Sequence, residues 1–453
     1  MKKQTSIIVV GGGFAGTTVA KRLAGRLPAD VTLTLVSEES YTTFHPMLPE
    51  AVGASIFPEQ VVAPLREIIR PGPMQQFIMG RVKGVDLASR TLHCATLAGD
   101  RMLPYDQLVL AFGNRARLDL IPGMAEHALP LKTVGDAMEI RNTVLRRVAR
   151  IELETDPALR IALGHFVVVG GGFSGVEVAG ELVDCLRSIR HFYPRVADGE
   201  LQVTVLQDLD RLLPELPLAL GQAALKSLRA RGVHVRLMTR ASAVLDSTVQ
   251  LASGDSLPTH TVISTIGTQP NALLKALGLP TERGRVTVAA DLSVPGHPGV
   301  WALGDCALVP NAHDGKPAPP TAQFAVREGQ QLADNLLAVL RGAATKPFCH
   351  RSLGAMASIG HMKGVAQAFG VPLSGLPAWL LWRAYYLSQM PTLRRKLRIF
   401  VEWTWGMFFP TDITHLRFSG SQALLQADRQ EAVDATVDPV KTAVAPATAA
   451  LRE

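Results

Sequence analysis

The sequence predicts an α/β fold with two similar domains, each built on a parallel sheet with helices on its faces. The main observation is an internal repeat. The strand Ile7-Ile8-Val9-Val10 and the strand Phe166-Val167-Val168-Val169 are each followed by glycines at the same spacing, namely Gly11, Gly13 and Gly16 in the first copy and Gly170, Gly172 and Gly175 in the second. The chain has 453 residues, of which 47% are hydrophobic, so it can bury more than one core.

Each copy continues in the same order of elements. In the first copy we expect a helix over residues 15–27 and a buried strand over 31–36 that ends near Glu38. In the second copy we expect a helix over 176–190 and a strand over 201–206 that ends at Gln207. Both copies therefore read as strand, glycine turn, helix and strand.

The three glycines of each copy have separate physical roles. The first permits a tight turn, the second lets the backbone approach a pyrophosphate, and the third lets the helix pack closely on the strand. The pyrophosphate then binds the unpaired N–H groups at the helix N-terminus. One such motif is weak evidence, but two copies, each followed by a polar residue placed to bond a ribose, predict two Rossmann-like dinucleotide-binding domains.

Later segments fit the same plan. Strands over 108–112 and 262–266 run into Gly113 and Gly267, as crossover strands between the two domains would. A strand over 300–303 leads to Gly304 and Asp305, and a helix follows over 322–340. Asp305 either accepts a hydrogen bond from a sugar hydroxyl or caps a helix, and the pattern leaves both roles open.

The C-terminal part differs from the rest. Strands are expected over 354–370, and residues 376–409 hold four of the five tryptophans beside a basic group of residues 394–398. A helix from Thr392 has apolar side chains on one face and basic ones mostly off it, which is typical of a helix lying in a membrane surface. A helix packed on the protein body or at a dimer contact is the alternative. Residues 426–453 are expected to be disordered.

Composition excludes several classes of protein. The net charge of +7 suits an anionic cofactor or a membrane surface better than a nucleic acid. The four cysteines lie far apart, so we expect no disulfide framework, no metal site and no redox-active dithiol, and a reducing compartment. No apolar stretch approaches the roughly 18 residues of a membrane span, so membrane contact would be peripheral.

At this point the sequence resembles the single-subunit type II NADH dehydrogenases, or alternative NADH:quinone oxidoreductases, which are two-dinucleotide-binding-domain flavoproteins. Beyond the glycine repeats, the matching segments are FHPMLPEAVGAS from Phe44, WALGDCA from Trp301, PPTAQFAVREG from Pro319, LGAMASIGHMKGVA from Leu353 and the tryptophan-rich C-terminus. The resemblance covers residues 6–418. It implies a respiratory-chain flavoprotein that passes a hydride from NADH to FAD and then two electrons to a membrane quinone, without pumping protons.

The resemblance also implies an organisation and a location. Residues 1–120 and 285–345 would form the FAD-binding domain, residues 121–284 the NAD(P)H-binding domain and residues 346–425 a membrane-docking region. The protein would be peripheral on the cytoplasmic face of the inner membrane, with a membrane quinone and the membrane surface as partners and no nucleic acid. Whether the protein forms a homodimer is left open.

Site residues follow from the same resemblance. Glu177, close to the two cofactor rings, would relay protons, and Gln323 would orient the quinone. The FAD residues would be Gly11, Gly13, Phe14, Ala15, Gly16, Glu38, Gly113, Gly304, Asp305 and Ala322. The NADH residues would be Gly170, Gly172, Phe173, Ser174, Gly175, Gln207 and Gly267.

Simpler interpretations stand beside these roles. Glu177 also fits a first-turn glutamate favoured by the helix dipole, and Gln323 fits a buried amide bonded to backbone. Glu181, one helical turn after Glu177, is either a second proton relay or a solvated neighbour. His45 and Lys363 lie in matching segments, but we assign neither a role.

Two departures from the family pattern matter. Gln207 stands where a glutamate usually selects NADH, and because an amide does not repel a 2′-phosphate, NADPH use is left open. Arg327 stands where a second glutamine often follows the Ala-Gln pair, which puts the acceptor pocket in question.

Related disulfide reductases and sulfide:quinone oxidoreductases need cysteines near the flavin. This sequence lacks them at the expected places, so both enzyme classes are less favoured. The remaining alternatives are a soluble NAD(P)H reductase for a ferredoxin- or rubredoxin-type protein, which would not need the C-terminal region, and a flavin-based redox sensor.

Overall fold

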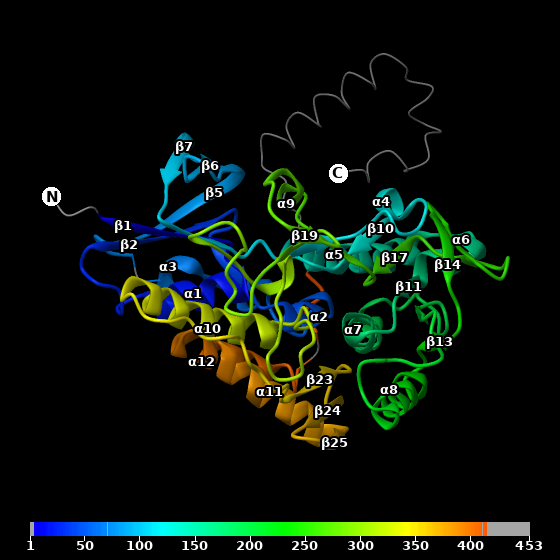
Figure 1. Ribbon diagram of the computed structural model, residues 1–453. Helices are drawn as coiled ribbons and strands as arrows, with labels where there is room; N and C mark the ends of the chain where they lie inside the picture. The colour runs from blue at the N-terminus through cyan, green and yellow to red at the C-terminus, as the bar shows by residue number, and fades with distance from the viewer. Residues whose placement is uncertain (1–3, 70, 410, 415–453) are drawn as a thin grey trace, which may run out of the picture. The chain divides into compact units, whose positions relative to one another are not determined.

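Two sheets, each with five parallel strands in an equivalent order, form the body of the computed structural model, which describes residues 4–69, 71–409 and 411–414 (Figure 1). In the first sheet β6 and β7 continue antiparallel. In the first sheet β1 pairs in parallel with both β2 and β8, so the strand order reverses at β1. The sheet order is β21 (Val300–Ala302), β8 (Gln107–Leu110), β1 (Thr5–Val10), β2 (Val31–Ser37), β5 (Gln75–Asp86), β6 (Thr91–Thr96) and β7 (Gly99–Pro104).

The second sheet repeats this arrangement. Here β11 pairs in parallel with both β12 and β17, so it takes the place that β1 has in the first sheet. The order is β10 (Ala128–Pro130), β17 (Thr261–Ser264), β11 (His165–Val169), β12 (Gln202–Leu206) and β13 (His234–Arg236). The predicted α/β fold with two Rossmann-like units is confirmed.

Smaller sheets and the helices complete the fold. The small sheets pair β3 (Tyr41–Thr43) with β4 (Val62–Pro64), β9 (Asn114–Ala116) with β18 (Thr268–Pro270), β14 (Ala241–Leu245) with β15 (Thr248–Leu251) and β16 (Ser256–Pro258), β19 (Thr281–Glu282) with β20 (Arg285–Thr287) and β22 (Ala307–Leu308), and β23 (Gly354–Ser358) with β24 (Gly364–Ala368) and β25 (Val371–Ser374). The α-helices are α1 (Phe14–Leu23), α2 (Leu48–Val52), α3 (Leu65–Ile69), α4 (Met124–His127), α5 (Val134–Leu153), α6 (Pro157–Gly164), α7 (Phe173–Ile189), α8 (Leu218–Ala230), α9 (Leu273–Ala276), α10 (Ala322–Leu340), α11 (Leu376–Gln389) and α12 (Leu393–Trp405).

The central strands are buried because helices or hairpins cover both faces of each sheet. All five residues of β11 and the last four of β1 are buried, as expected for strands inside a parallel sheet. The third glycine of each motif makes the helix contact possible. A Cβ on Gly16 would overlap the carbonyl oxygen of Gly11, and one on Gly175 would overlap that of Gly170.

Helix α10 lies directly against α1, although some 300 residues separate them in the sequence (Figure 1). At the contact, a Cβ on Gly329 would lie 2.8 Å from the carbonyl oxygen of Ala15 and 2.9 Å from Cβ of Thr18. This close packing fixes the first turn of α10 beside the first glycine loop.

The C-terminal helices correct one expectation. Three of the four tryptophans expected at a membrane surface are buried in the protein, namely Trp379, Trp382 and Trp403, whereas Trp405 is 61% exposed. The first helix is also shorter than expected and ends at Leu23. The tail expected over residues 426–453 lies outside the described residues.

We expect Gly329→Ala to destabilise the protein by about 1–3 kcal/mol, because the new methyl group must displace the backbone of α1. This loss would outweigh the roughly 1 kcal/mol that alanine gains over glycine in a helix. Thermal unfolding followed by circular dichroism would measure the change.

Gly135→Ala in α5 is the matched control, since a Cβ there makes only an ordinary contact of 3.5 Å. Equal unfolding midpoints for the two variants would show that the contact between α1 and α10 is not tight.

Candidate active site

A cavity of about 2680 Å³ lies where both parallel sheets present their carboxyl ends. It is lined by residues that follow β1, β2, β8 and β21 of the first sheet and β10, β11 and β17 of the second. Small-ligand pockets usually enclose roughly 300–1,000 Å³, so this cavity has room for more than one large ligand. Ligands of doubly wound sheets bind at this position, where the strand order reverses.

The cavity brings together most of the predicted site residues from both domains. Those that line it are Gly11, Gly13, Phe14, Ala15, Glu38, Gly113, Phe173, Ser174, Glu177, Gly304, Asp305, Ala322 and Gln323. Those that do not line it are Gly16, Gly170, Gly172, Gly175, Gln207 and Gly267.

The first glycine loop presents free donors to the cavity. Gly11 has φ +112°, and a Cβ there would overlap the carbonyl oxygen of Ala111, so only glycine fits. Helix α1 begins after Gly13 with no side chain bonded to its first N–H groups, and a Cβ on Gly13 would meet open space. These N–H groups, at the positive end of the helix dipole, suit a pyrophosphate.

The second loop has the same geometry at the start of α7. Gly170 has φ +114°, and Gly172 precedes α7 without a side-chain cap. Gln207 is buried at the end of β12, where its Oε1 accepts a hydrogen bond of 2.8 Å from the N–H of Gly171. The amide of Gln207 is thereby fixed against the loop.

Charged groups surround the first loop. Glu38 pairs with Arg115 at 3.0 Å and with Arg81 at 3.7 Å, at the half-exposed rim of the cavity. Burial raises the pKa of Asp305, although the ammonium of Lys132 opposes the shift. Burial lowers the pKa of Lys132, which also lines the cavity, and the attraction of Asp305 opposes this.

Glu328 is a site residue that sequence reasoning did not identify. Its carboxylate accepts a hydrogen bond of 2.7 Å from the N–H of Gly304, which joins α10 to the loop that carries Asp305. Burial raises the pKa of Glu328 to about 7. Its neighbour Arg327 instead points to the cavity rim and bonds Gln330 at 3.1 Å.

Gln323 is oriented by the segment before β23. Its Oε1 accepts hydrogen bonds from the backbone N–H of Leu353 at 3.2 Å and from Nε2 of His350 at 3.4 Å. The carbonyl end of the amide is therefore engaged, and the NH₂ group is the end left to donate toward the cavity.

Glu177 is buried in the first turns of α7, with 7% of its surface exposed. Its Oε1 accepts a hydrogen bond of 3.1 Å from the N–H of Ser358, at the end of β23. Burial raises the pKa of Glu177 well above its usual value, and the nearby Glu50 and Glu181 raise it further. Burial and the neighbouring carboxylates therefore both favour the protonated form of Glu177.

Two more glutamates lie behind Glu177, away from the cavity. Glu181 is 4% exposed, which excludes the solvated alternative for this residue, and Glu50 is 1% exposed. Arg383 of α11 lies 3.6 Å from Glu50, and Nε1 of Trp403 donates to Glu50 at 2.9 Å. No local sequence pattern indicated Glu50 or Arg383, because their partners are more than 300 residues away.

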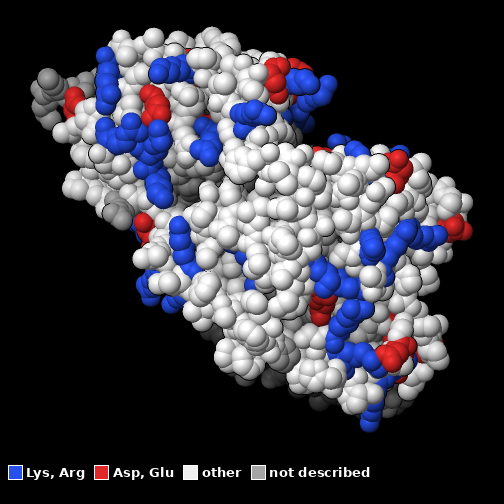
Figure 2. All heavy atoms as spheres, turned by 90° about the horizontal axis from the view of Figure 1, so that it is seen from below, with Lys and Arg blue, Asp and Glu red and all other residues white. Residues whose placement is uncertain are grey.

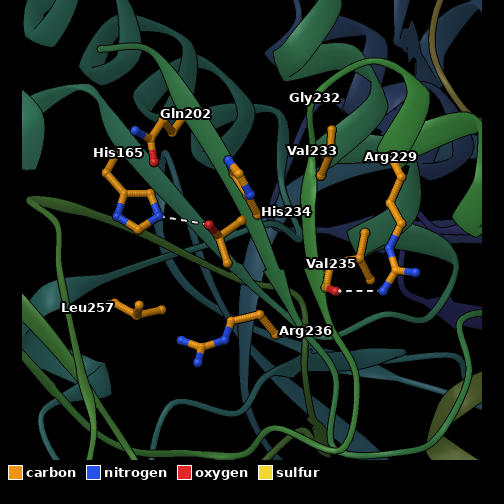
Figure 3. A pocket seen from close by; sticks show the side chains of 10 residues that line it. His165, Gln202, Arg229, Gly232, Val233, His234, Val235, Arg236 and Leu257 are labelled. Carbon is orange, nitrogen blue, oxygen red and sulfur yellow. Dashed lines mark hydrogen bonds between the residues drawn. The ribbon is translucent and has the colours of Figure 1, made fainter. Parts of the chain in front are cut away.

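A second, smaller pocket of about 580 Å³ lies apart from these residues, between β11, β12, β13 and β16 (Figure 3). Its wall includes His165, which bonds Thr204 through Nε2 and the carbonyl oxygen of Pro258 through Nδ1, both at 2.8 Å. Both ring nitrogens are thus already engaged, and none of the predicted site residues lies here.

The four cysteines are free and none lines the cavity. Cys306 is buried, and burial raises its pKa to about 11. Within residues 4–69, 71–409 and 411–414, no three His, Cys, Asp or Glu side chains come close enough to hold a metal ion.

Helix α12 and the residues after it carry an exposed apolar surface, which we call the α12 face. Figure 2, viewed from the side on which α11 and α12 lie in Figure 1, shows a broad area without charged side chains and with Lys and Arg along its borders. The α12 face consists of Leu393, Leu397, Phe400, Val401, Trp405, Phe408 and Phe409.

Comparison with protein families gives two matches that together span most of the chain. Residues 5–329 match the family described as pyridine nucleotide-disulphide oxidoreductase, and residues 352–412 match the NDH2 C-terminal domain.

Individual relatives agree with these matches. The type II NADH:quinone oxidoreductase NdhA of Mycobacterium tuberculosis is 30% identical over 89% of this chain and 87% of its own length. The demethylphylloquinone reductase NdbB of Synechocystis is 30% identical over 88% of this chain and 95% of its own length. The structure of Plasmodium falciparum NDH2 in complex with NADH superposes with a TM-score of 0.84 over 91% of this chain and all of that chain, at 18% identity, which shows a shared fold.

Proposed function

This chain belongs to the pyridine nucleotide-disulphide oxidoreductase family, and within it to the type II NADH:quinone oxidoreductases, and from that premise we propose that it oxidises NADH with FAD and reduces a membrane quinone without pumping protons. The observation that carries the proposal is the single cavity that the first glycine loop, the start of α7 and Gln323 share. A cofactor held there by the first glycine loop would share the cavity with a nicotinamide donor and with a second acceptor.

The residues fit FAD in the first domain. Gly13 leaves uncapped N–H groups beside open space, as a pyrophosphate requires, while Glu38 and Asp305 offer carboxylates to sugar hydroxyls. When bound, FAD supplies the two-electron chemistry that links NADH to the acceptor. We assign residues 1–120 and 285–345 to this domain and 121–284 to the NAD(P)H domain, since β21 rejoins the first sheet after the second is complete.

Glu177 and Gln323 are the residues that act on the quinone in this proposal. Reduction of a quinone to a quinol consumes protons, and the surroundings of Glu177 at the cavity wall favour its protonated form. The NH₂ group of Gln323 donates a hydrogen bond to a quinone carbonyl, because its own carbonyl is already engaged. NADH oxidation itself needs positioning and no side-chain acid.

Attachment to the membrane follows from the α12 face. Helices of the described chain are all too short or too polar to span a bilayer. The α12 face instead suits insertion into the membrane surface, with Arg394 and Arg398 nearby to meet lipid phosphates. We place the protein on the cytoplasmic face of the inner membrane. A soluble reductase would not expose such a surface.

The first test separates the two halves of the reaction. We expect Glu177→Gln to leave flavin reduction by NADH within about twofold and to slow flavin reoxidation by a short-chain quinone about 100-fold or more, since an amide cannot supply the proton. Anaerobic stopped-flow absorbance measures both steps. Equal reoxidation rates in the variant and the wild type would remove Glu177 from proton delivery.

Nicotinamide selection depends on Gln207. Gln207→Glu keeps an oxygen for the N–H of Gly171 and adds a charge that repels a 2′-phosphate. We expect the ratio of kcat/KM for NADH over NADPH to rise about tenfold, which corresponds to roughly 1.4 kcal/mol. Gln202→Glu, at the other end of β12, is the control. An unchanged ratio in Gln207→Glu would show that the adenosine ribose of the nicotinamide cofactor does not lie beside residue 207.

Docking is tested on the α12 face by the double variant Leu397→Glu, Phe400→Glu. Each substitution removes the roughly 1.5–3 kcal/mol of free energy that the apolar side chain gains on burial in lipid. Sedimentation with anionic liposomes should therefore fall steeply, while activity with a water-soluble quinone persists. Leu153→Glu is the control, since Leu153 is also exposed but lies on α5. Sedimentation that survives the double variant would move the membrane contact to another surface.

A further inference from the structure

Three buried glutamates and one arginine form a cluster behind the wall of the cavity. Glu177 lines the cavity, whereas Glu50, Glu181 and Arg383 lie behind it. Because one guanidinium cannot balance three carboxylates in a buried site, the cluster must hold protons.

Glu181 connects Glu177 to a group near the surface. The two glutamates are one turn apart on α7, where side chains four residues apart are neighbours. On its other side, Oε2 of Glu181 accepts a hydrogen bond of 2.5 Å from the hydroxyl of Ser55. Ser55 is partly exposed and lies beside the end of α12, where a Cβ on Gly406 would be 3.6 Å from its carbonyl oxygen.

Glu50 has a different role in the cluster. Its carboxylate faces Arg383 and accepts from Trp403, and the guanidinium of Arg383 in turn lies 3.7 Å from the ring centre of Trp379. Arg383 is therefore held in place. Burial raises the pKa of Glu50, and Arg383 and Trp403 oppose the shift, so Glu50 is the fixed partner of these two side chains.

Charges around Glu181 favour its protonated form. Burial, together with the charges of Glu50 and Asp184, raises the pKa of Glu181 to about 8, against the opposing effects of Ser55 and Arg383. Glu181 can therefore both hold and release a proton near neutral pH.

We infer that Ser55 and Glu181 are the proton inlet of the active site and that they refill Glu177 from water at the membrane surface, beside the end of α12. The inference rests on the proposed function. Each cycle moves one proton: Glu177 gives its carboxyl proton to a quinone oxygen, Glu181 reprotonates Glu177, and Ser55 passes its hydroxyl proton to Glu181 and takes another from water. One cycle serves each NADH, because the hydride of NADH brings two electrons and one hydrogen, and the proton from Glu177 supplies the second hydrogen of the quinol.

The experiment compares Glu181→Gln and Ser55→Ala with the wild type in anaerobic stopped flow, in H₂O and in D₂O. We expect flavin reduction by NADH to stay within about twofold, while reoxidation by a short-chain quinone slows about tenfold or more and its solvent isotope effect rises. Glu181→Asp should restore part of the rate. Glu139→Gln, exposed on α5, is the control for the same chemical change.

The outcomes separate the inference from the function on which it rests. A wild type that quinone does not reoxidise contradicts the proposed function. A responsive wild type with unchanged rates and isotope effects in both variants overturns the inlet alone. If the Glu181→Gln variant no longer binds flavin, the Ser55→Ala variant alone tests the inference. A rate of flavin reoxidation in Ser55→Ala equal to that of the wild type would then overturn it.

Discussion

The active site depends on backbone contacts that only glycine allows. Because Gly16 and Gly175 carry no Cβ, α1 and α7 can start directly at the ends of β1 and β11, with their first N–H groups free. The same requirement applied twice produces two loops at the carboxyl ends of two sheets. The cavity between them follows from this repetition, and so does its chemistry, since each loop is built for an anionic cofactor.

The C-terminal region closes the cavity and supplies its polar groups. The segment before β23 holds Gln323, the end of β23 holds Glu177, and α11 brings Arg383 to Glu50. Trp379, Trp382 and Trp403 are buried in this packing, so Trp405 is the one tryptophan of this region on the α12 face. Removal of the whole region would therefore disturb the active site together with membrane attachment.

Local sequence patterns predicted the strands, the glycine loops and the helices that start at the cavity, because those features depend on neighbours within about 20 residues. They did not predict the burial of Trp403 or the pairing of Glu50 with Arg383, since these depend on contacts between residues more than 300 positions apart. Glu328 was missed because its partner, the N–H of Gly304 in the loop after β21, is 24 residues away and no local pattern pairs the two. Family resemblance pointed to Glu177 and Gln323, but only the fold showed which end of each side chain is free.

The most direct measurement of the central claim is anaerobic stopped-flow absorbance of the wild-type flavoprotein, mixed first with NADH and then with a short-chain quinone. The account predicts that NADH bleaches the flavin rapidly, that quinone restores its absorbance just as completely, and that both steps are fast enough to support steady-state turnover. A flavin that NADH bleaches but that quinone leaves reduced would contradict the account and would point to a protein acceptor or a sensor.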